Sequence, residues 1–216
     1  MWTEYRSRDG ESISESGICR HRRNRSFFYG NTAADRSLPW KDWVEQFCKG
    51  YEHAKEEGDK IGLQVFFGWE SGYHGTEFLI YGLNKEWLFE HPEIKDADVK
   101  EQYELVHAGG GIVSHAHPFR EEDYIPEIRL FPDCVDAVEG INATHESPAS
   151  MSHKNILYNE KAIAYAKEHG LPITAGSDQH TTRMIGGGML FDRKLSDEKI
   201  LQGSACRGGK SILERQ

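Results

Sequence analysis

Short apolar runs alternate along this chain with segments of helical periodicity, and this alternation constrains the fold more than any other feature. Runs of strand length occur at Leu63–Trp69, Phe78–Leu83, Ile112–Ser114, Ala137–Ile141 and Pro172–Ala175. Amphipathic helices, each followed by glycine, are expected at Lys41–Glu57, Asp96–Ala108 and His153–His169. Strands that alternate with helices are typical of a parallel α/β sheet or barrel.

Composition limits the classes of protein that fit this pattern. A chain of 216 residues is long enough to bury one domain core. Its formal net charge of −9 argues against a broad nucleic-acid surface, although Arg20, Arg22, Arg23 and Arg25 cluster locally. No apolar run is long enough to span a bilayer, and the four cysteines form no CxxC pair. With no secretory leader at its start, the chain is expected to be a reduced, cytoplasmic protein.

The two ends of the chain lack the apolar periodicity of its middle. Residues 1–26 are rich in Ser, Arg, Glu and Gly, so we expect an irregular N-terminal segment without a first strand. A missing first strand would leave an exposed sheet edge that invites pairing with another chain. Residues 196–216 carry no periodic core signal and are expected to form a C-terminal tail. One globular domain is therefore expected over residues 27–195.

Polar side chains of the kinds that bind metals follow the expected strands one after another. They are Glu70, His115 and His117, Asn142 and His145, and Asp178 and His180. The carboxyl ends of strands form the active-site face of parallel α/β folds. Imidazole nitrogens and carboxylate oxygens suit Zn, Mn or Fe, and residues two apart on an extended segment point to the same side. The pattern predicts a divalent-metal site whose cavity both His115 and His117 reach.

Each of these residues also has an ordinary explanation when it is taken alone. A single histidine is more often a surface or hydrogen-bonded residue than a metal ligand, and Gly-Ser-Asp is a common turn sequence. Glu70 is equally compatible with an exposed carboxylate. The order of these residues at successive strand ends favours the metal site over coincidence.

Three motifs in this order resemble the polymerase-and-histidinol-phosphatase (PHP) family of metal-dependent phosphoesterases. They are Gly68-Trp69-Glu70, Ser114-His115-Ala116-His117-Pro118 and Gly176-Ser177-Asp178-Gln179-His180, within a resemblance that covers about Phe27–Asp192. The resemblance implies an α/β fold of the distorted (β/α)7-type barrel kind that holds several metal ions. It also implies that Glu70 bridges two ions and that His117, Asp178 and His180 are ligands, with His115 as an outer or alternative ligand.

The N-terminal motifs of that family are not intact in this chain. PHP proteins open with H-x-H-T, followed by a serine and Asp-Gly, and later carry T-D-H. In this chain Thr3, Ser7 and Asp9-Gly10 resemble the end of the first motif without its two histidines. Where T-D-H is expected, the chain has Arg20-His21-Arg22-Arg23-Asn24. The expected strand Phe78–Leu83 also offers no histidine, and His74 is the nearest candidate. We therefore expect a truncated or disrupted N-terminal motif region, a barrel that is incomplete there, and at least one ion lost or loosely held.

The resemblance implies hydrolysis of a small-molecule phosphoester by metal-activated water. Glu70 and Asp178 would be catalytic residues, and Arg120 or Arg183, just downstream of the ligand motifs, would hold the phosphate. A solvated surface charge is the competing explanation for either arginine. Because the N-terminal ligands are missing, turnover is expected to be weak or absent.

Two other classes of function stay open. One is a metal-dependent hydrolase of the amidohydrolase type, which acts on C–N bonds and would be separated by a substrate panel of phosphoesters and amides. The other is a non-catalytic metal-binding remnant, which the missing H-x-H and T-D-H motifs favour. Near-zero metal in protein purified without a chelator would favour a remnant or a regulatory domain over an enzyme.

Overall fold

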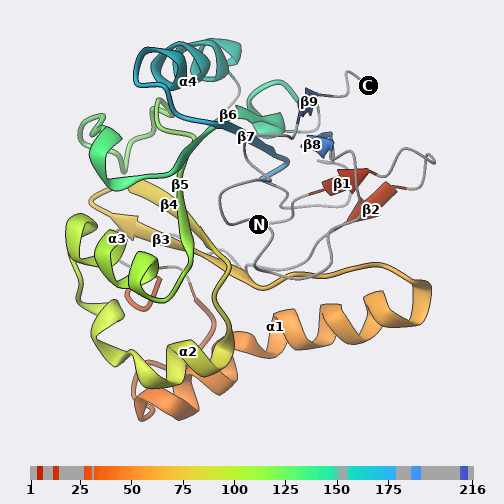
Figure 1. Ribbon diagram of the computed structural model, residues 1–216, viewed down its shortest axis with the longest axis vertical. Coiled ribbons are helices and arrows are strands. Elements are labelled where there is room, and N and C mark those ends of the chain that lie inside the picture. The colour runs from red at the N-terminus through yellow and green to blue at the C-terminus, as the bar shows by residue number, and fades with distance from the viewer. Residues whose placement is uncertain are drawn as a thin grey trace.

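The strands of this protein form two sheets in a computed structural model, which describes residues 4–6, 12–14, 27–30, 32–148, 150, 155–178, 186–190 and 210–213 (Figure 1). The five-stranded sheet has the order β3-β4-β5-β6-β7, and the four-stranded sheet has the order β2-β1-β8-β9. The strands are β1 (Glu4–Arg6), β2 (Ser12–Ser14), β3 (Gly68–Tyr73), β4 (Thr76–Tyr81), β5 (Ile112–Ala116), β6 (Ala137–Asn142), β7 (Ile173–Gly176), β8 (Gly187–Leu190) and β9 (Lys210–Leu213). The helices are α1 (Trp40–Ile61), α2 (Lys85–Glu90), α3 (Val99–Ala108) and α4 (Ile156–Glu168), with short turns η1 (Pro92–Lys95), η2 (Pro132–Cys134) and η3 (Ala143–His145).

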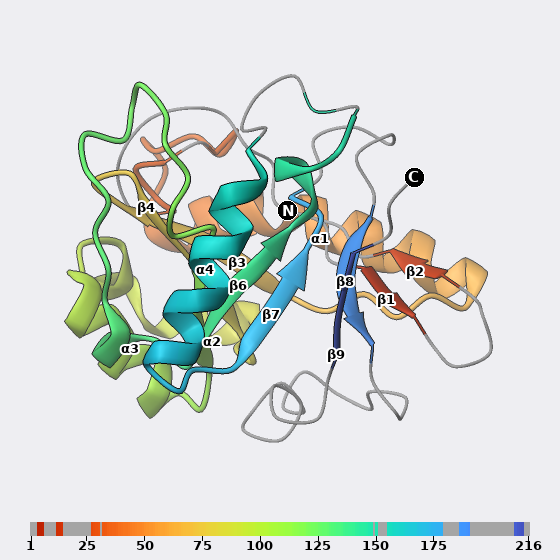
Figure 2. The ribbon, with the colours of Figure 1, turned by 90° about the horizontal axis from the view of Figure 1, so that it is seen from above.

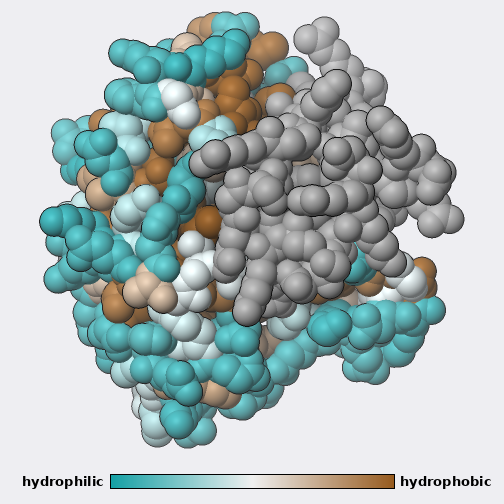
Figure 3. Space-filling view, viewed as in Figure 1, coloured by the Kyte–Doolittle hydropathy of each residue, from teal (hydrophilic) through white to brown (hydrophobic). Residues whose placement is uncertain are grey.

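The helix α1 extends past its expected end at Glu57. It ends at Ile61 and is capped by Gly62, whose φ of 75° places it in the left-handed region that glycine adopts without strain. Gly58 therefore lies inside the helix, and the prediction that it stops the helix is wrong. A Cβ on Gly58 would lie 2.7 Å from Val65 Cγ2, so the glycine lets the returning chain pack closely against the helix. The outer side of α1 is lined by hydrophilic residues (Figure 3).

An aromatic cluster joins α1 to the five-stranded sheet. Trp43 is fully buried and stacks on Trp40 and Phe47, with ring centroids 5.3 Å and 4.9 Å apart. Phe27 packs against Trp43 and against Trp69 of β3, at 5.4 Å and 5.7 Å. Large aromatic rings bury more apolar surface than any other side chains, so this cluster is a main source of stability.

The direction of β4 differs from the uniformly parallel sheet expected from the sequence. β4 pairs antiparallel with both β3 and β5, whereas β5, β6 and β7 are parallel neighbours. The reason is the two-residue turn at His74 and Gly75, both with positive φ, which is the geometry of a tight β-hairpin. A parallel connection would need a crossover of about a dozen residues or more.

This topology brings one end of each strand to a single edge of the sheet. β3 runs in the same direction as β5 because β4 lies between them and runs the opposite way. The carboxyl ends of β3, β5, β6 and β7 and the start of β4 therefore lie along the same edge. Helix α4 lies over β6 and β7 (Figure 2), where Ala162 and Ala166 pack against Val138.

The four-stranded sheet corrects two expectations about the ends of the chain. β1 pairs parallel with β8 and antiparallel with β2, so strand pairing does occur within residues 1–26. β9 pairs with β8, so residues 196–216 are not wholly a tail without structure. Strands of three or four residues are shorter than the windows over which apolar periodicity can be recognised. The division into domains itself stays a prediction.

The α/β class is confirmed, and the distorted barrel is not. The strands of the described residues form two separate ladders rather than one closed ring. Ser177, just after β7, links the two sheets, because its hydroxyl donates to Gly187 O at 2.9 Å and accepts from Gly187 N at 3.2 Å. Among the described helices, none is both long and apolar enough to cross a membrane.

Candidate metal centre

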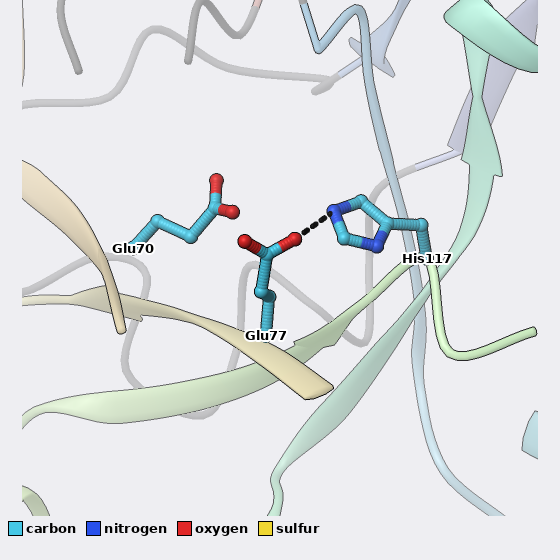
Figure 4. Close-up of side chains that lie close together, drawn as sticks. All are labelled: Glu70, Glu77 and His117. Atoms are coloured by element: carbon cyan, nitrogen blue, oxygen red, sulfur yellow. Dashed lines mark ion pairs between the residues drawn. The ribbon is translucent and has the colours of Figure 1, made fainter. Parts of the chain in front are cut away.

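Glu70, Glu77 and His117 converge at the shared edge of the five-stranded sheet. One donor atom from each side chain lies within 4.8 Å of the donors of the other two. Figure 4 shows Glu70 on β3, Glu77 on β4 and His117 just after β5, with their polar ends turned toward one another. His117 Nε2 lies 3.4 Å from Glu77 Oε2. The β3–β4 hairpin and the residue after β5, which are about forty residues apart in the sequence, thus contribute to one group.

The register of the β3–β4 hairpin places the two glutamates on one face. Gly72 of β3 pairs with Glu77 of β4. Glu70 lies two residues before Gly72, and side chains two apart on a strand share a face. Glu70 is therefore a diagonal neighbour of Glu77, within reach of a long side chain. The expectation that Glu70 follows a strand is wrong, because it lies inside β3.

His117 reaches this group because the chain leaves the strand at that residue. Its φ is 28°, an uncommon left-handed value for a residue with a side chain. Its backbone N donates to Glu139 Oε2 at 3.0 Å, which holds the turn in place. Strained backbone of this kind is often found at functional sites. His117 itself is buried, with 4% of its surface exposed.

His115 does not join the group. It pairs with Phe78 of β4, whereas Glu77 pairs with Ala116, so His115 lies on the opposite face of the sheet from Glu77. Its ring stacks on Phe78 with centroids 5.1 Å apart, and burial lowers its pKa to about 3. The expectation that His115 and His117 point to the same side is wrong, because His117 departs from the extended conformation.

Arg120 lies inside the site with its side chain fully buried. Its Nη1 is 3.1 Å from Asp178 Oδ2, and its Nη2 contacts Glu77 Oε2. The explanation of Arg120 as a solvated surface charge is therefore wrong. Its predicted role in holding phosphate stays a prediction, and both of its terminal nitrogens already contact carboxylates.

Asp178 is buried beside Arg120 rather than within the group of three. Asn142 Nδ2 donates to Asp178 Oδ2 at 3.3 Å, and Thr144 Oγ1 donates to Asp178 O at 3.1 Å. These bonds join the end of β6 to the end of β7. The φ of Asp178 is 42°, so this residue also sits in the left-handed region at a strand end. His180 and Arg183 lie outside the described residues, and their predicted roles stay predictions.

Glu139 of β6 connects His117 of the metal group to Asn142, which in turn contacts Asp178. Its Oε2 accepts from His117 N at 3.0 Å and from Asn142 Nδ2 at 3.1 Å. Burial raises the pKa of Glu139 to about 7, and the nearby charge of Asp178 adds to that rise. Sequence reasoning missed this residue because a glutamate inside a buried apolar strand has no ligand spacing that marks it.

Replacing Glu139 with glutamine is expected to flatten the pH dependence of stability. The folded-state pKa near 7 lies above the ordinary value of 4.5, so the folded protein binds more protons between those values. Stability is therefore fully present below pH 4.5 and is lost as pH rises through about 7. Between about pH 5 and pH 8 the wild type should lose on the order of 2 kcal/mol more than Glu139→Gln. Urea unfolding at both pH values measures this, and parallel profiles would contradict it.

Glu77 is the second residue that sequence reasoning missed. The expected ligands lie at the carboxyl ends of strands, whereas Glu77 lies at the start of an antiparallel strand. The signal that was available is the His74-Gly75 pair, which is compatible with a two-residue hairpin turn. The expected strands Leu63–Trp69 and Phe78–Leu83 both leave out residues 70–77, so the register of the hairpin was not predicted. Without the register, Glu70 and Glu77 cannot be placed on one face.

The donors of the group suit a divalent metal ion. Two carboxylates and one imidazole offer oxygen and nitrogen atoms, which Zn, Mn and Fe accept as ligands. Their mutual distances, all within 4.8 Å, fit ligands around one ion. A small pocket lies next to the group and is lined in part by Glu77, His117, Arg120 and Arg129. The arrangement can hold an ion at the wall of a pocket that carries both charge signs.

Comparison with known proteins supports the resemblance drawn from the motifs. Residues 157–202 match a family model described as PHP-associated, a stretch that contains Asp178, His180 and Arg183. This match confirms the predicted resemblance to the PHP family. No curated protein matches the chain.

Among solved structures, the chain is distantly similar to a protein from Bifidobacterium adolescentis that is provisionally named a metal-dependent phosphoesterase. The two chains are 16% identical, the similarity covers 74% of this chain and 82% of the other, and the TM-score is 0.41.

Proposed function

Starting from the PHP-type segment at residues 157–202, we propose that this protein is a metal-dependent phosphoesterase that acts on a small-molecule phosphoester. The convergence of Glu70, Glu77 and His117 carries this proposal. Two of the three, Glu70 and His117, are residues for which the motifs implied metal binding, and they come from separate strands. A chance cluster of acidic groups would not be expected to include a buried histidine such as His117, whose backbone N donates to a further carboxylate, that of Glu139.

The chain's own residues can hold and orient the reacting groups. A bound divalent ion supplies charge stabilisation and lowers the pKa of a coordinated water. Glu139 fixes the backbone at His117, and a ligand whose supporting residues are fixed keeps its geometry when substrate binds. Arg120, and Arg183 by the motif resemblance, are the candidate cations for the phosphate, and Asp178 is the candidate catalytic carboxylate beside Arg120.

The proposed enzyme works with a reduced set of metal ligands. The H-x-H and T-D-H motifs are absent from residues 1–26, and the group on β3, β4 and the residue after β5 is the part of the centre, among the described residues, that can still hold an ion. The distorted barrel fold that the PHP resemblance implies is also part of this proposal. The Ser177 bonds to Gly187 support it, since they bring the edge strand β7 against β8.

Turnover of a generic aryl phosphate tests the proposal. The purified chain with added Mn or Zn should release phosphate slowly, and removal of the ion with a chelator should abolish that release. His117→Ala should lose the activity, because it removes one of three ligands, by about 100-fold or more. His53→Ala, on the exposed side of α1, is the matched control and should behave as the wild type.

Other outcomes of the same assay identify the alternatives. Faster turnover of amides than of phosphoesters would replace the proposal with an amidohydrolase-type activity. Metal binding without turnover of any substrate in the panel would identify a non-catalytic remnant. Phosphate release that survives both chelation and His117→Ala would contradict the proposed site.

A further inference from the structure

Arg120 shares a carboxylate with the group that would hold the ion. Its Nη2 contacts Glu77 Oε2, and that same oxygen lies 3.4 Å from His117 Nε2. Its Nη1 lies 3.1 Å from Asp178 Oδ2. The guanidinium therefore occupies the space between Glu77 and Asp178, which is where an ion ligated by both carboxylates would have to sit.

We propose that Arg120 is a built-in cation that takes the place of a second metal ion, so that the centre holds a single divalent ion on Glu70, Glu77 and His117. This inference rests on the metal centre of the proposed function. It assigns to Arg120 the role of a positioning residue that neutralises Asp178 and orients Glu77, and it removes Asp178 from the ligands of the ion.

The balance of buried charge supports a single ion. Buried charges need partners, because an unpaired charge in a protein interior is costly. Asp178 is buried, and Glu70 and Glu77 are half-buried. Among the described side chains, one guanidinium and one divalent ion match the charge of these three carboxylates, and burial raises the pKa of the neighbouring Glu139 to about 7. A second divalent ion at Asp178 would lie beside a guanidinium that stays protonated in proteins, and the two cations would repel each other at short range.

The environment of Asp178 keeps it turned toward Arg120. Asn142 donates to its Oδ2 at 3.3 Å, and Thr144 holds its backbone oxygen at 3.1 Å. Only 2% of Asp178 and 1% of Arg120 are exposed, so solvent cannot substitute for either partner. A charge-assisted pair of this kind, supported by neighbouring hydrogen bonds, is a fixed part of the structure.

Counting bound Mn²⁺ by electron paramagnetic resonance tests the inference on the full chain. The wild type should bind one equivalent of Mn²⁺. Arg120→Met removes the charge while keeping much of the volume, so Glu77 and Asp178 become available and the count should rise to two. Arg120→Lys, which keeps a cation, should stay at one. A wild-type count of two, or an Arg120→Met count that stays at one, would overturn the inference.

A second variant keeps the test decisive if Arg120→Met does not fold. Asp178→Asn should still bind one equivalent of Mn²⁺, because Asp178 is not a ligand of the ion but an outer partner that acts through Arg120. Its loss of affinity should stay within the range of about 10–100-fold that outer partners of metal sites produce. If Asp178 is a ligand, Mn²⁺ binding should fall by more than that or disappear. That loss would overturn the inference.

The outcomes also separate this inference from the proposed function. A wild-type chain that binds no Mn²⁺ would contradict the metal centre itself, and both proposals would fall. Two ions in the wild type would leave the metal-dependent phosphoesterase standing and remove only the role of Arg120. Retention of one ion together with slow phosphate release would support both.

Discussion

Replacing Glu77 with glutamine is expected to weaken divalent-metal binding by about 100-fold or more. Glutamine keeps the size of the side chain and removes its charge, so the ion loses an anionic ligand from a group of three. The variant also removes one of the two ion pairs of Arg120 among the described residues and leaves the pair with Asp178. Because a buried cation with too few partners is costly, the variant should lose some stability as well.

Isothermal titration with Zn or Mn measures this loss of affinity. Glu168→Gln is a matched control, because Glu168 is an exposed glutamate at the C-terminal end of α4 and is not part of the metal group. It should bind the ion as tightly as the wild type does. An unchanged affinity in Glu77→Gln would mean that the ion is held by residues other than the hairpin glutamates, and the site proposed above would be wrong.

The largest loss of stability is expected for Trp43→Ala. Trp43 is fully buried and stacks between Trp40 and Phe47, with Phe27 packed against it edge-on. Truncation removes this apolar surface and leaves a cavity that rigid aromatic neighbours cannot fill, which costs about 3–5 kcal/mol. Urea unfolding of the wild type and the variant measures the difference in the free energy of unfolding.

Ile61→Ala provides the contrast for the aromatic cluster. Ile61 lies at the end of the same helix and is 78% exposed, so its truncation should change stability by less than about 0.5 kcal/mol. Equal effects of the two variants would show that the cluster beneath α1 is not part of the cooperative core.

The sequence predicted the parallel part of the five-stranded sheet well. The expected strands at Ala137–Ile141 and Pro172–Ala175 agree with β6 and β7 to within one residue at each end, because both are apolar runs bounded by clear breaks. The helix expected at His153–His169 agrees with α4 except for its first turn, where residues 151–154 lie outside the described part of the chain. Short apolar runs for the two strands and helical periodicity for α4 made these elements predictable from the sequence.

The hairpin was misread because its register depends on backbone conformation. Whether His74 and Gly75 form a two-residue turn depends on their positive φ values, which the order of residue types only suggests. Shifting a strand by one residue moves every side chain to the other face. The motif therefore identified Glu70, while its partner Glu77 became visible only once the pairing of β3 with β4 was known.

The histidine motif shows the same limit on a smaller scale. The spacing of His115 and His117 predicts one shared direction only if both residues are extended. The φ of 28° at His117 breaks that condition, and the two rings lie on opposite faces of the sheet. The motif indicated that a histidine at this position is a ligand. Local backbone geometry determined that His117, rather than His115, reaches the group.

Anomalous scattering from crystals of the full chain grown with Zn tests the central claim most directly. The account predicts one ion at the sheet edge, with donor atoms of Glu70, Glu77 and His117 at about 2.0–2.2 Å. It also predicts that Arg120 remains between Glu77 and Asp178, with no ion on Asp178. A map with no ion among Glu70, Glu77 and His117, while Zn occupies another position on the protein, would contradict the account.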